Sequence, residues 1–380
     1  EEGEEGAAAL LEVSLLQRDF HIRSPRASLQ NAAAGGERSL AVPSFTLDLD
    51  LPPEQRWRGF YEPRREQLLA SLPTERPKGE WLRSLKLDVE EEYLAELRGI
   101  VRAMNDSRVT LEALLWRELG YEHGATMGCT AVLAAAADGR VFHGRNLDLP
   151  GGGPSLVSEL LDVTIARGGK AIAVTTVFLF MVGVHTALRF DGYSVAQNTR
   201  NGCEDAEANA QAARAGARPF TFFLRHLIEE VPDFATAVQR SASVFLMAPQ
   251  YFTFAGPGAW DAALVTRDRE GIKEEPYGNV LTLSPEISRW YIVQTNDDVN
   301  HRPADSRRPV ALQKLRGMRP AEVDQDTVQD VMMLEPVHNG ATVFTWVVDP
   351  SQNARRLLLS NEEVHSDKGM QGQVLPCPSC

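Results

Sequence analysis

Met127-Gly128-Cys129-Thr130 opens the stretch that decides the fold of this chain, and an apolar run (131–137), the pair Asp138-Gly139 and the segment Val141-Phe142-His143-Gly144-Arg145-Asn146-Leu147-Asp148 follow it. Asp-Gly is typical of a tight hairpin turn, because both residues tolerate a positive φ. The pattern predicts two antiparallel strands, and the returning strand brings Arg145 and Asp148 back beside Cys129. An arginine that favours a thiolate and a carboxylate that holds another group would suit a nucleophilic thiol. Taken alone, a cysteine in an apolar run is more often an inert buried residue.

A second polar cluster follows the alternating segment 289–296, which ends in Thr295-Asn296. Asp305, Arg307 and Arg308 come shortly afterwards. A side-chain amide at the end of a strand can donate to a developing oxyanion without adding charge. From the residues alone, Asn296 is more often a turn residue, and the charged residues would form an exposed ion-pair loop that adds little stability.

Together the two motifs resemble the family of acid ceramidase and N-acylethanolamine-hydrolysing acid amidase, which are N-terminal-nucleophile (Ntn) hydrolases related to choloylglycine hydrolase. The resemblance rests on Cys129-Thr130, on 143–148 and on Val293-Gln294-Thr295-Asn296, and it spans residues 45–360. It implies that the chain cuts itself between Gly128 and Cys129, so that Cys129 becomes a new N-terminus. An α-amine titrates at about pH 8 and can take a thiol proton without a distant histidine.

The resemblance also implies roles for other residues. Arg145 would favour the thiolate, Asp148 would orient the amine, Asn296 would stabilise the oxyanion, and Arg307 would support the site. Asn198 resembles a position whose backbone lies near the reacting carbonyl, although a turn-forming asparagine is an equal alternative. The spacer from Glu122 to Cys129 is longer than the family usually has, and the segment 296–307 is shorter.

The resemblance implies a fold of the α+β class, an αββα four-layer sandwich of two antiparallel sheets flanked by helices. We expect a poorly ordered N-terminal extension (1–40), a helical α-subunit (41–128) and a catalytic β-subunit (129–380) that arise from one precursor. The segment 47–51 alternates apolar and acidic residues before two prolines, which predicts an edge strand. A helix is expected over 89–104, with its glutamates, Glu96 included, facing water. The last strand is expected at 342–348.

The composition excludes some partners. The chain has 380 residues and a net charge of −13, so nothing concentrates cations for a nucleic-acid backbone. Residues 171–188 contain no Lys, Arg, Asp or Glu, which is just long enough for a membrane span. The run is rich in Val, Thr and Phe and is broken at Gly183, so two buried strands and no transmembrane segment are expected. We expect neither a metal nor another cofactor.

Three further features concern processing and location. Cys377 and Cys380 close the chain, and a disulfide between them is favoured over a thioredoxin-type redox site, because no strand–helix context follows. Asn105-Asp106-Ser107 is a glycosylation sequon whose position matches a glycosylated site in the family. The chain starts at Glu1 without a methionine, which suggests a processed form. The resemblance implies a lysosome or comparable acidic lumen, or secretion.

The implied substrate is a long-chain N-acyl amide lipid, met in transient contact with a lipid surface. Ceramide is preferred, with N-acylethanolamines as the alternative, and a non-catalytic lipid-binding relative is kept as a different class. Candidate walls for the acyl chain are apolar side chains, each of which is more often plain core, namely Phe178, Phe180, Met181 and Tyr251.

Overall fold

The computed structural model describes residues 42–72, 82, 85, 87–122, 128–149, 153–200, 205–271, 280–299, 305–360 and the backbone of 372–375. The expected N-terminal extension and the pair Cys377 and Cys380 lie outside these residues.

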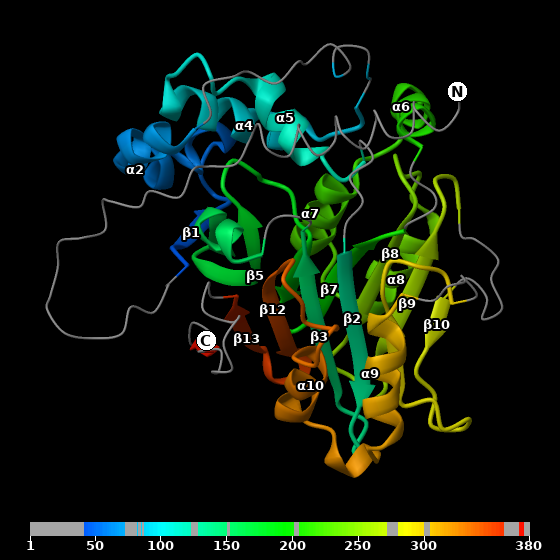
Figure 1. The fold of residues 1–380 in the computed structure, drawn as a ribbon. Helices are drawn as coiled ribbons and strands as arrows, with labels where there is room; N and C mark the ends of the chain where they lie inside the picture. Colours follow the sequence, from blue (N-terminus) through cyan, green and yellow to red (C-terminus); the bar gives the residue numbers. More distant parts are fainter. Residues whose placement is uncertain are drawn as a thin grey trace, which may run out of the picture.

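Two sheets form the centre of the molecule (Figure 1). The larger sheet has the strand order β1 (Ser44–Asp48), β4 (Leu160–Arg167), β5 (Lys170–Phe178), β6 (Thr186–Arg189), β7 (Tyr193–Thr199), β8 (Gln250–Ala255), β9 (Ala262–Arg267) and β10 (Val280–Thr282). The smaller sheet has the order β11 (Tyr291–Gln294), β2 (Gly128–Ala135), β3 (Val141–Asp148), β12 (Thr342–Asp349), β13 (Ala354–Leu359) and β14 (Gly372–Leu375). All pairings are antiparallel except that of β1 with β4, which is parallel. β1 lies at an edge of the sheet, as predicted, but it covers Ser44–Asp48 instead of 47–51.

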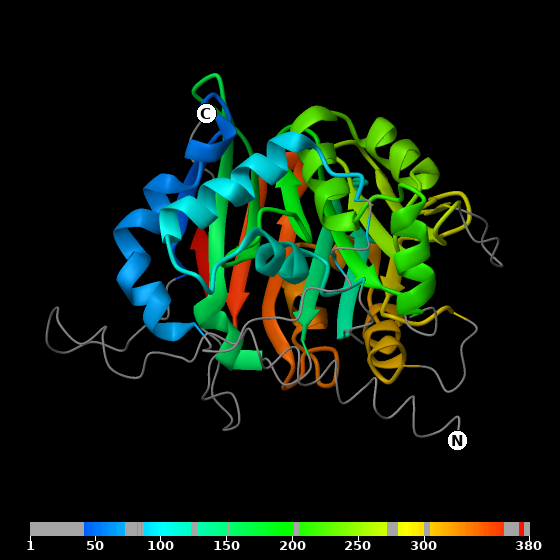
Figure 2. The same cartoon turned by 90° about the horizontal axis from the view of Figure 1, so that it is seen from above.

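Helices cover both outer faces, as seen from above in Figure 2. The large sheet packs against α2 (Arg58–Ser71), α4 (Glu91–Met104), α5 (Leu111–Glu118), α7 (Phe220–Glu230) and α8 (Phe234–Ser243). The small sheet packs against α9 (Arg307–Arg316) and α10 (Gln325–Met332), and α6 (Ala206–Arg214) packs beside α5. The predicted αββα sandwich is therefore confirmed.

The central hairpin has the predicted form. β2 and β3 pair from Gly128 opposite Asp148 to Ala135 opposite Val141, and Gly139 in the turn has a φ of 88°. Successive side chains of β2 point to different layers, because a strand has a period of two residues. Val132 and Ala134 pack against α9 and α10, whereas Leu133 and Ala135 pack against β8 and β9 of the other sheet.

The run at 171–188 forms β5 and β6, as predicted. No helix of the described ranges is long and apolar enough to cross a membrane. The expectation that 342–348 is the last strand was wrong, since β13 and β14 follow β12. The sequence of β13 contains arginines, which do not match the pattern of a buried strand. Arg355 is nevertheless buried, because it forms an ion pair with Asp162 of β4 (2.6 and 2.8 Å) and lies over the ring of Trp346.

Glu96 was also predicted wrongly, because it is fully buried instead of facing water. Its carboxylate accepts hydrogen bonds from Arg56 Nη1 (2.9 Å), Trp57 Nε1 (2.6 Å) and Arg225 Nη2 (3.1 Å). Helical periodicity could not reveal this role, since Arg225 lies far along the chain. The cluster joins the segment before the hairpin to α7 after it.

We predict that Glu96→Ala lowers the free energy of unfolding by about 3–5 kcal/mol, because it leaves two buried guanidinium groups without their shared acceptor. Chemical denaturation measures the loss. Glu91→Ala is the control, since Glu91 is exposed on the same helix and its ion pair with Arg98 lies at the surface. Equal unfolding midpoints for the two variants would contradict the prediction.

Candidate active site

Cys129 is the second residue of β2 and its side chain is fully buried. It stands opposite Leu147, one residue before Asp148. The hairpin thus brings Arg145 and Asp148 beside Cys129, as predicted. The two residues point to different layers, because three positions separate them on one strand: Arg145 contacts β6 of the large sheet, whereas Asp148 contacts α9 and the start of β12.

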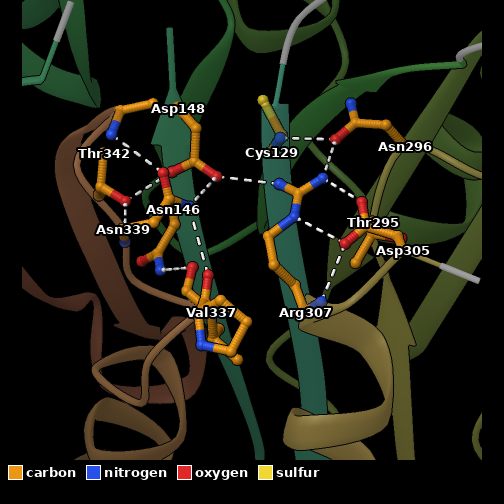
Figure 3. A network of polar contacts seen from close by, with 12 residues as sticks. Cys129, Asn146, Asp148, Thr295, Asn296, Asp305, Arg307, Val337, Asn339 and Thr342 are labelled. Carbon is orange, nitrogen blue, oxygen red and sulfur yellow. Dashed lines mark hydrogen bonds and ion pairs between the residues drawn. The ribbon is translucent and has the colours of Figure 1, made fainter. Parts of the chain in front are cut away.

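A network of hydrogen bonds starts at the backbone nitrogen of Cys129 (Figure 3). This nitrogen donates to Asn296 Oδ1 (2.6 Å), and Arg307 Nη2 donates to the same oxygen (2.8 Å). The other terminal nitrogen of Arg307 donates to Asp148 Oδ2 (2.9 Å). Three segments that are distant in sequence therefore meet at the position where a new N-terminus would form.

The orientation of the Asn296 amide follows from its neighbours. A backbone N–H and a guanidinium can only donate, so the atom between them must be the amide oxygen. The amide nitrogen then donates to Thr199 O (2.9 Å). In this arrangement Asn296, and not Asp148, is the acceptor in contact with the Cys129 nitrogen, and its N–H group is engaged away from the predicted oxyanion.

The structure adds partners for Asp148 that the sequence analysis missed. Thr342 Oγ1 donates to Asp148 Oδ1 (2.7 Å), and Asn339 Nδ2 donates to Asp148 Oδ2 (3.3 Å). The only sequence signal was the turn-forming pair Asn339-Gly340 just before a predicted strand. These bonds leave the Asp148 carboxylate in a fixed orientation.

Arg307 is held from its other side by Asp305, whose Oδ1 accepts from the Arg307 backbone N–H and from Nε, both at 2.9 Å. Burial opposes the charge of the guanidinium, but the bonds to Asp305 and the charge of Asp148 raise the pKa of Arg307 above its ordinary value. Burial likewise opposes the charge of Asp305, and Arg307 outweighs it and lowers the pKa of that carboxyl. The alternative of an exposed ion-pair loop is excluded for Arg307, which is buried.

Arg145 is 1% exposed and has no carboxylate partner among the described residues. Its Nε donates to Thr186 Oγ1, and Nη1 lies 3.5 Å from Asn198 Oδ1. Within the described part of the chain, Nη2 is buried without a hydrogen-bond partner. A buried cation with a spare donor can stabilise a thiolate or another anion.

Two buried imidazoles near Arg145 are neutral. Burial, assisted by the positive charge of Arg145, lowers the pKa of His143 and of His185 to about 3. His143 forms hydrogen bonds with Ser194 (2.8 Å) and Thr253 (3.0 Å) of the facing sheet, so it holds the two sheets together. Among the described residues, no group of three His, Cys, Asp or Glu side chains is arranged to hold a metal ion.

No family model matches the chain, but comparisons with known proteins find similar enzymes. N-acylethanolamine-hydrolyzing acid amidase of Rattus norvegicus is 28% identical over 324 residues, which cover 82% of this chain and 86% of that protein. Acid ceramidase of Mus musculus is 27% identical over 339 residues, covering 81% of this chain and 84% of that protein. The solved structure of a Caenorhabditis elegans ortholog of the amidase has a TM-score of 0.55 at 26% identity, and covers 65% of this chain and 100% of that one.

This chain is a homologue of those acid amidases and acid ceramidases. The predicted resemblance and the Ntn-hydrolase fold are therefore confirmed.

The structure separates the candidate substrate-binding residues of this homologue. Phe178 and Met181 pack in the same buried apolar cluster as Cys129. Phe180 belongs to the outer layer, where its ring stacks on Tyr61 at 5.2 Å, and the Tyr251 hydroxyl donates to Asp298. Asn198 is not a turn residue, because it lies in β7 and its Nδ2 donates to the carbonyls of Gln294 and Thr295, both at 3.1 Å.

Two expected processing positions differ in what surrounds them. Asn105 is exposed at the C-terminal end of α4 with a φ of 42°, so its side chain is accessible. Gly128 is tightly enclosed, because a Cβ atom there would lie 3.1 Å from Asp148 Cβ and 3.4 Å from Arg307 Nη1. The residue before Cys129 thus packs against the ion pair.

Glu122, the last described residue before Gly128, is fully buried, and its Oε1 accepts from the Phe220 backbone N–H (2.9 Å). Burial raises the pKa of Glu122 from 4.5 to about 8. A folded state that binds this proton more tightly than the unfolded state is favoured at low pH, and this stabilisation is lost as the pH rises through about 8.

We predict that wild type loses stability relative to Glu122→Gln between pH 5 and pH 8, on the order of 3 kcal/mol, because the variant has no charge to bury. Unfolding free energies at several pH values measure the difference. Glu112→Gln, at an exposed position of α5, should show no such dependence. A gap between wild type and Glu122→Gln that does not change with pH would refute the prediction.

Proposed function

We propose that this chain is an amide hydrolase that uses Cys129 as an N-terminal nucleophile and cleaves N-acyl amides of fatty acids. One observation carries the proposal: the backbone nitrogen of Cys129 is held by Asn296 Oδ1, in line with the Arg307–Asp148 ion pair. Buried groups that orient a single backbone nitrogen are needed if that nitrogen becomes a catalytic amine. The names of the homologues support the reaction class.

The first reaction is self-cleavage between Gly128 and Cys129. The Cys129 thiol attacks the Gly128 carbonyl carbon, the peptide C–N bond breaks, and the nitrogen takes the proton, which leaves a thioester and a free amine. Water then releases the Gly128 carboxylate and restores the thiol. The close approach of Asp148 and Arg307 to Gly128 supports this step, because it restricts the residue before the nucleophile. The products are the α-subunit (41–128, with the extension 1–40) and the β-subunit (129–380).

The second reaction repeats this chemistry on the substrate. The Cys129 amine takes the thiol proton, the thiolate attacks the acyl carbonyl, the leaving amine receives the proton, and water hydrolyses the acyl thioester. Asn296 Oδ1 orients the amine, with Asp148 acting through Arg307. The spare Nη2 of Arg145 favours the thiolate. Oxyanion stabilisation by Asn296 requires its N–H group to leave Thr199 O, and Asn198 is linked to the same segment through its bond to Thr295 O.

The substrate is proposed to be a long-chain lipid amide, taken up in transient contact with a lipid surface. Ceramide remains the preference from the sequence, and N-acylethanolamines remain the alternative, since homologues of both names match at similar identity. We also propose an acidic lumen such as the lysosome, or secretion, as the location. Glycosylation at the accessible Asn105 suits either.

Incubation at acid and neutral pH should convert the chain into fragments of roughly 14 and 28 kDa, from 128 and 252 residues, the larger beginning at Cys129. Intact mass and N-terminal sequencing detect them. Cys129→Ala is expected to stay whole and to hydrolyse nothing, because it lacks the thiol. An uncut Cys129→Ala protein that retains amidase activity would refute the mechanism.

Head-group preference can be measured with two substrates that share one acyl chain, N-palmitoylsphingosine and N-palmitoylethanolamine. We expect a higher kcat/KM for the ceramide, and release of the same fatty acid from both. A higher value for the ethanolamide would overturn the preference while leaving the mechanism intact. Binding of both lipids by a cleaved sample, without turnover, would instead indicate the non-catalytic lipid-binding relative.

A further inference from the structure

The turn 179–184 between β5 and β6 is held by buried side chains. Tyr61 Oη accepts a hydrogen bond from the Phe180 N–H (2.7 Å). Glu118 Oε1 accepts from the N–H groups of both Val182 and Gly183, the latter at 3.0 Å. Tyr61 and Glu118 belong to the segment before the hairpin, and both are fully buried.

The same turn is connected to the surroundings of Cys129. Phe178 and Met181, at and just after the end of β5, belong to the buried apolar cluster that contains Cys129. Thr186, at the start of β6, accepts the hydrogen bond of Arg145 Nε. A shift of the turn would therefore move both part of the apolar cluster that contains Cys129 and the hydrogen-bond partner of Arg145 Nε.

Three features show that the conformation of this turn depends on particular residues. Burial raises the pKa of Glu118 to about 7, although two backbone N–H groups stabilise its charge. Phe180 has a φ of 67°, which is strained for an aromatic residue. At Gly183 a Cβ atom would lie 2.5 Å from Thr221 Cβ and 2.6 Å from Glu118 Oε2, so only glycine fits.

We propose that Tyr61 and Glu118 are positioning residues that hold the turn 179–184 as the wall along the fatty acyl chain. This inference rests on the proposed function. An acyl thioester on Cys129 Sγ needs apolar surroundings, and the cluster that contains Cys129 includes Phe178 and Met181. The part of the chain that becomes the α-subunit thereby sets selectivity for acyl length, although it contributes no group to the chemical step.

The test compares Tyr61→Phe with Tyr93→Phe in the full-length, processed protein. Both tyrosines are buried in the segment before the hairpin, but the Tyr93 hydroxyl donates to Glu229 of α7 and not to a group of the turn. The readouts are kcat and KM for N-acyl amides with a common head group and acyl chains of 8 to 18 carbons.

For Tyr61→Phe we expect the ratio of kcat/KM between the longest and the shortest substrate to fall about fivefold, mainly through KM, because one buried acceptor is lost. Tyr93→Phe should keep the wild-type ratio. Glu118→Gln, which retains one carbonyl oxygen for the two N–H groups, should have a smaller effect than Glu118→Ala. A uniform loss across all chain lengths, or equal ratios in the two tyrosine variants, would overturn the wall assignment.

The outcome for wild type separates this inference from the proposed function. A wild type that is cleaved and hydrolyses acyl amides, with variants of unchanged selectivity, refutes the wall alone. A wild type that hydrolyses no acyl amide refutes the proposed function and the wall with it.

Discussion

The site depends on one buried guanidinium. Arg307 binds Asp148 at the end of the central hairpin and Asn296 after the neighbouring strand. It also binds Asp305, which lies just before the helix α9 that Arg307 begins. Arginine suits this place because its planar fork offers several donors in fixed directions and stays charged when buried. Burying a cation is costly unless carboxylates compensate it, and two carboxylates do so here. The geometry around Cys129 is therefore a consequence of how this charge is neutralised.

Local patterns were sufficient for the parts of the site that lie on one hairpin. The Asp-Gly turn and the flanking apolar runs predicted the pairing of β2 with β3, and that pairing alone places Arg145 and Asp148 near Cys129. A period of two residues also predicts that these side chains diverge, which the structure bears out through their different partners. The resemblance to a known family was needed to connect Asn296 and Arg307 with the hairpin, since more than a hundred residues separate them.

Other features could not be read from the sequence, because their partners are distant and their residue types misleading. Glu96 has the pattern of a solvated helix face, yet Arg225 makes its burial favourable. Arg355 is untypical of a buried strand, but its ion pair with Asp162 makes its burial in β13 favourable. Thr342 and Asn339 carry no charge that would mark them, although they orient Asp148. Aromatic residues gave the weakest signal: of Phe178 and Phe180, which are two positions apart, one packs in the apolar cluster that contains Cys129 and the other in the outer layer.

The arrangement is compatible with both of the reactions proposed for this site. In the uncut chain the Cys129 nitrogen is an amide that already donates to Asn296 Oδ1. Cleavage would turn that nitrogen into an amine without requiring its acceptor to move, because Arg307 and Thr199 hold Asn296 independently of the scissile bond. At this nitrogen, an acceptor that is oriented before the reaction costs no reorganisation. The segment before the hairpin must stay docked for this to hold after cleavage, and its buried bonds to the turn 179–184 and to α7 do not involve the bond that is cut.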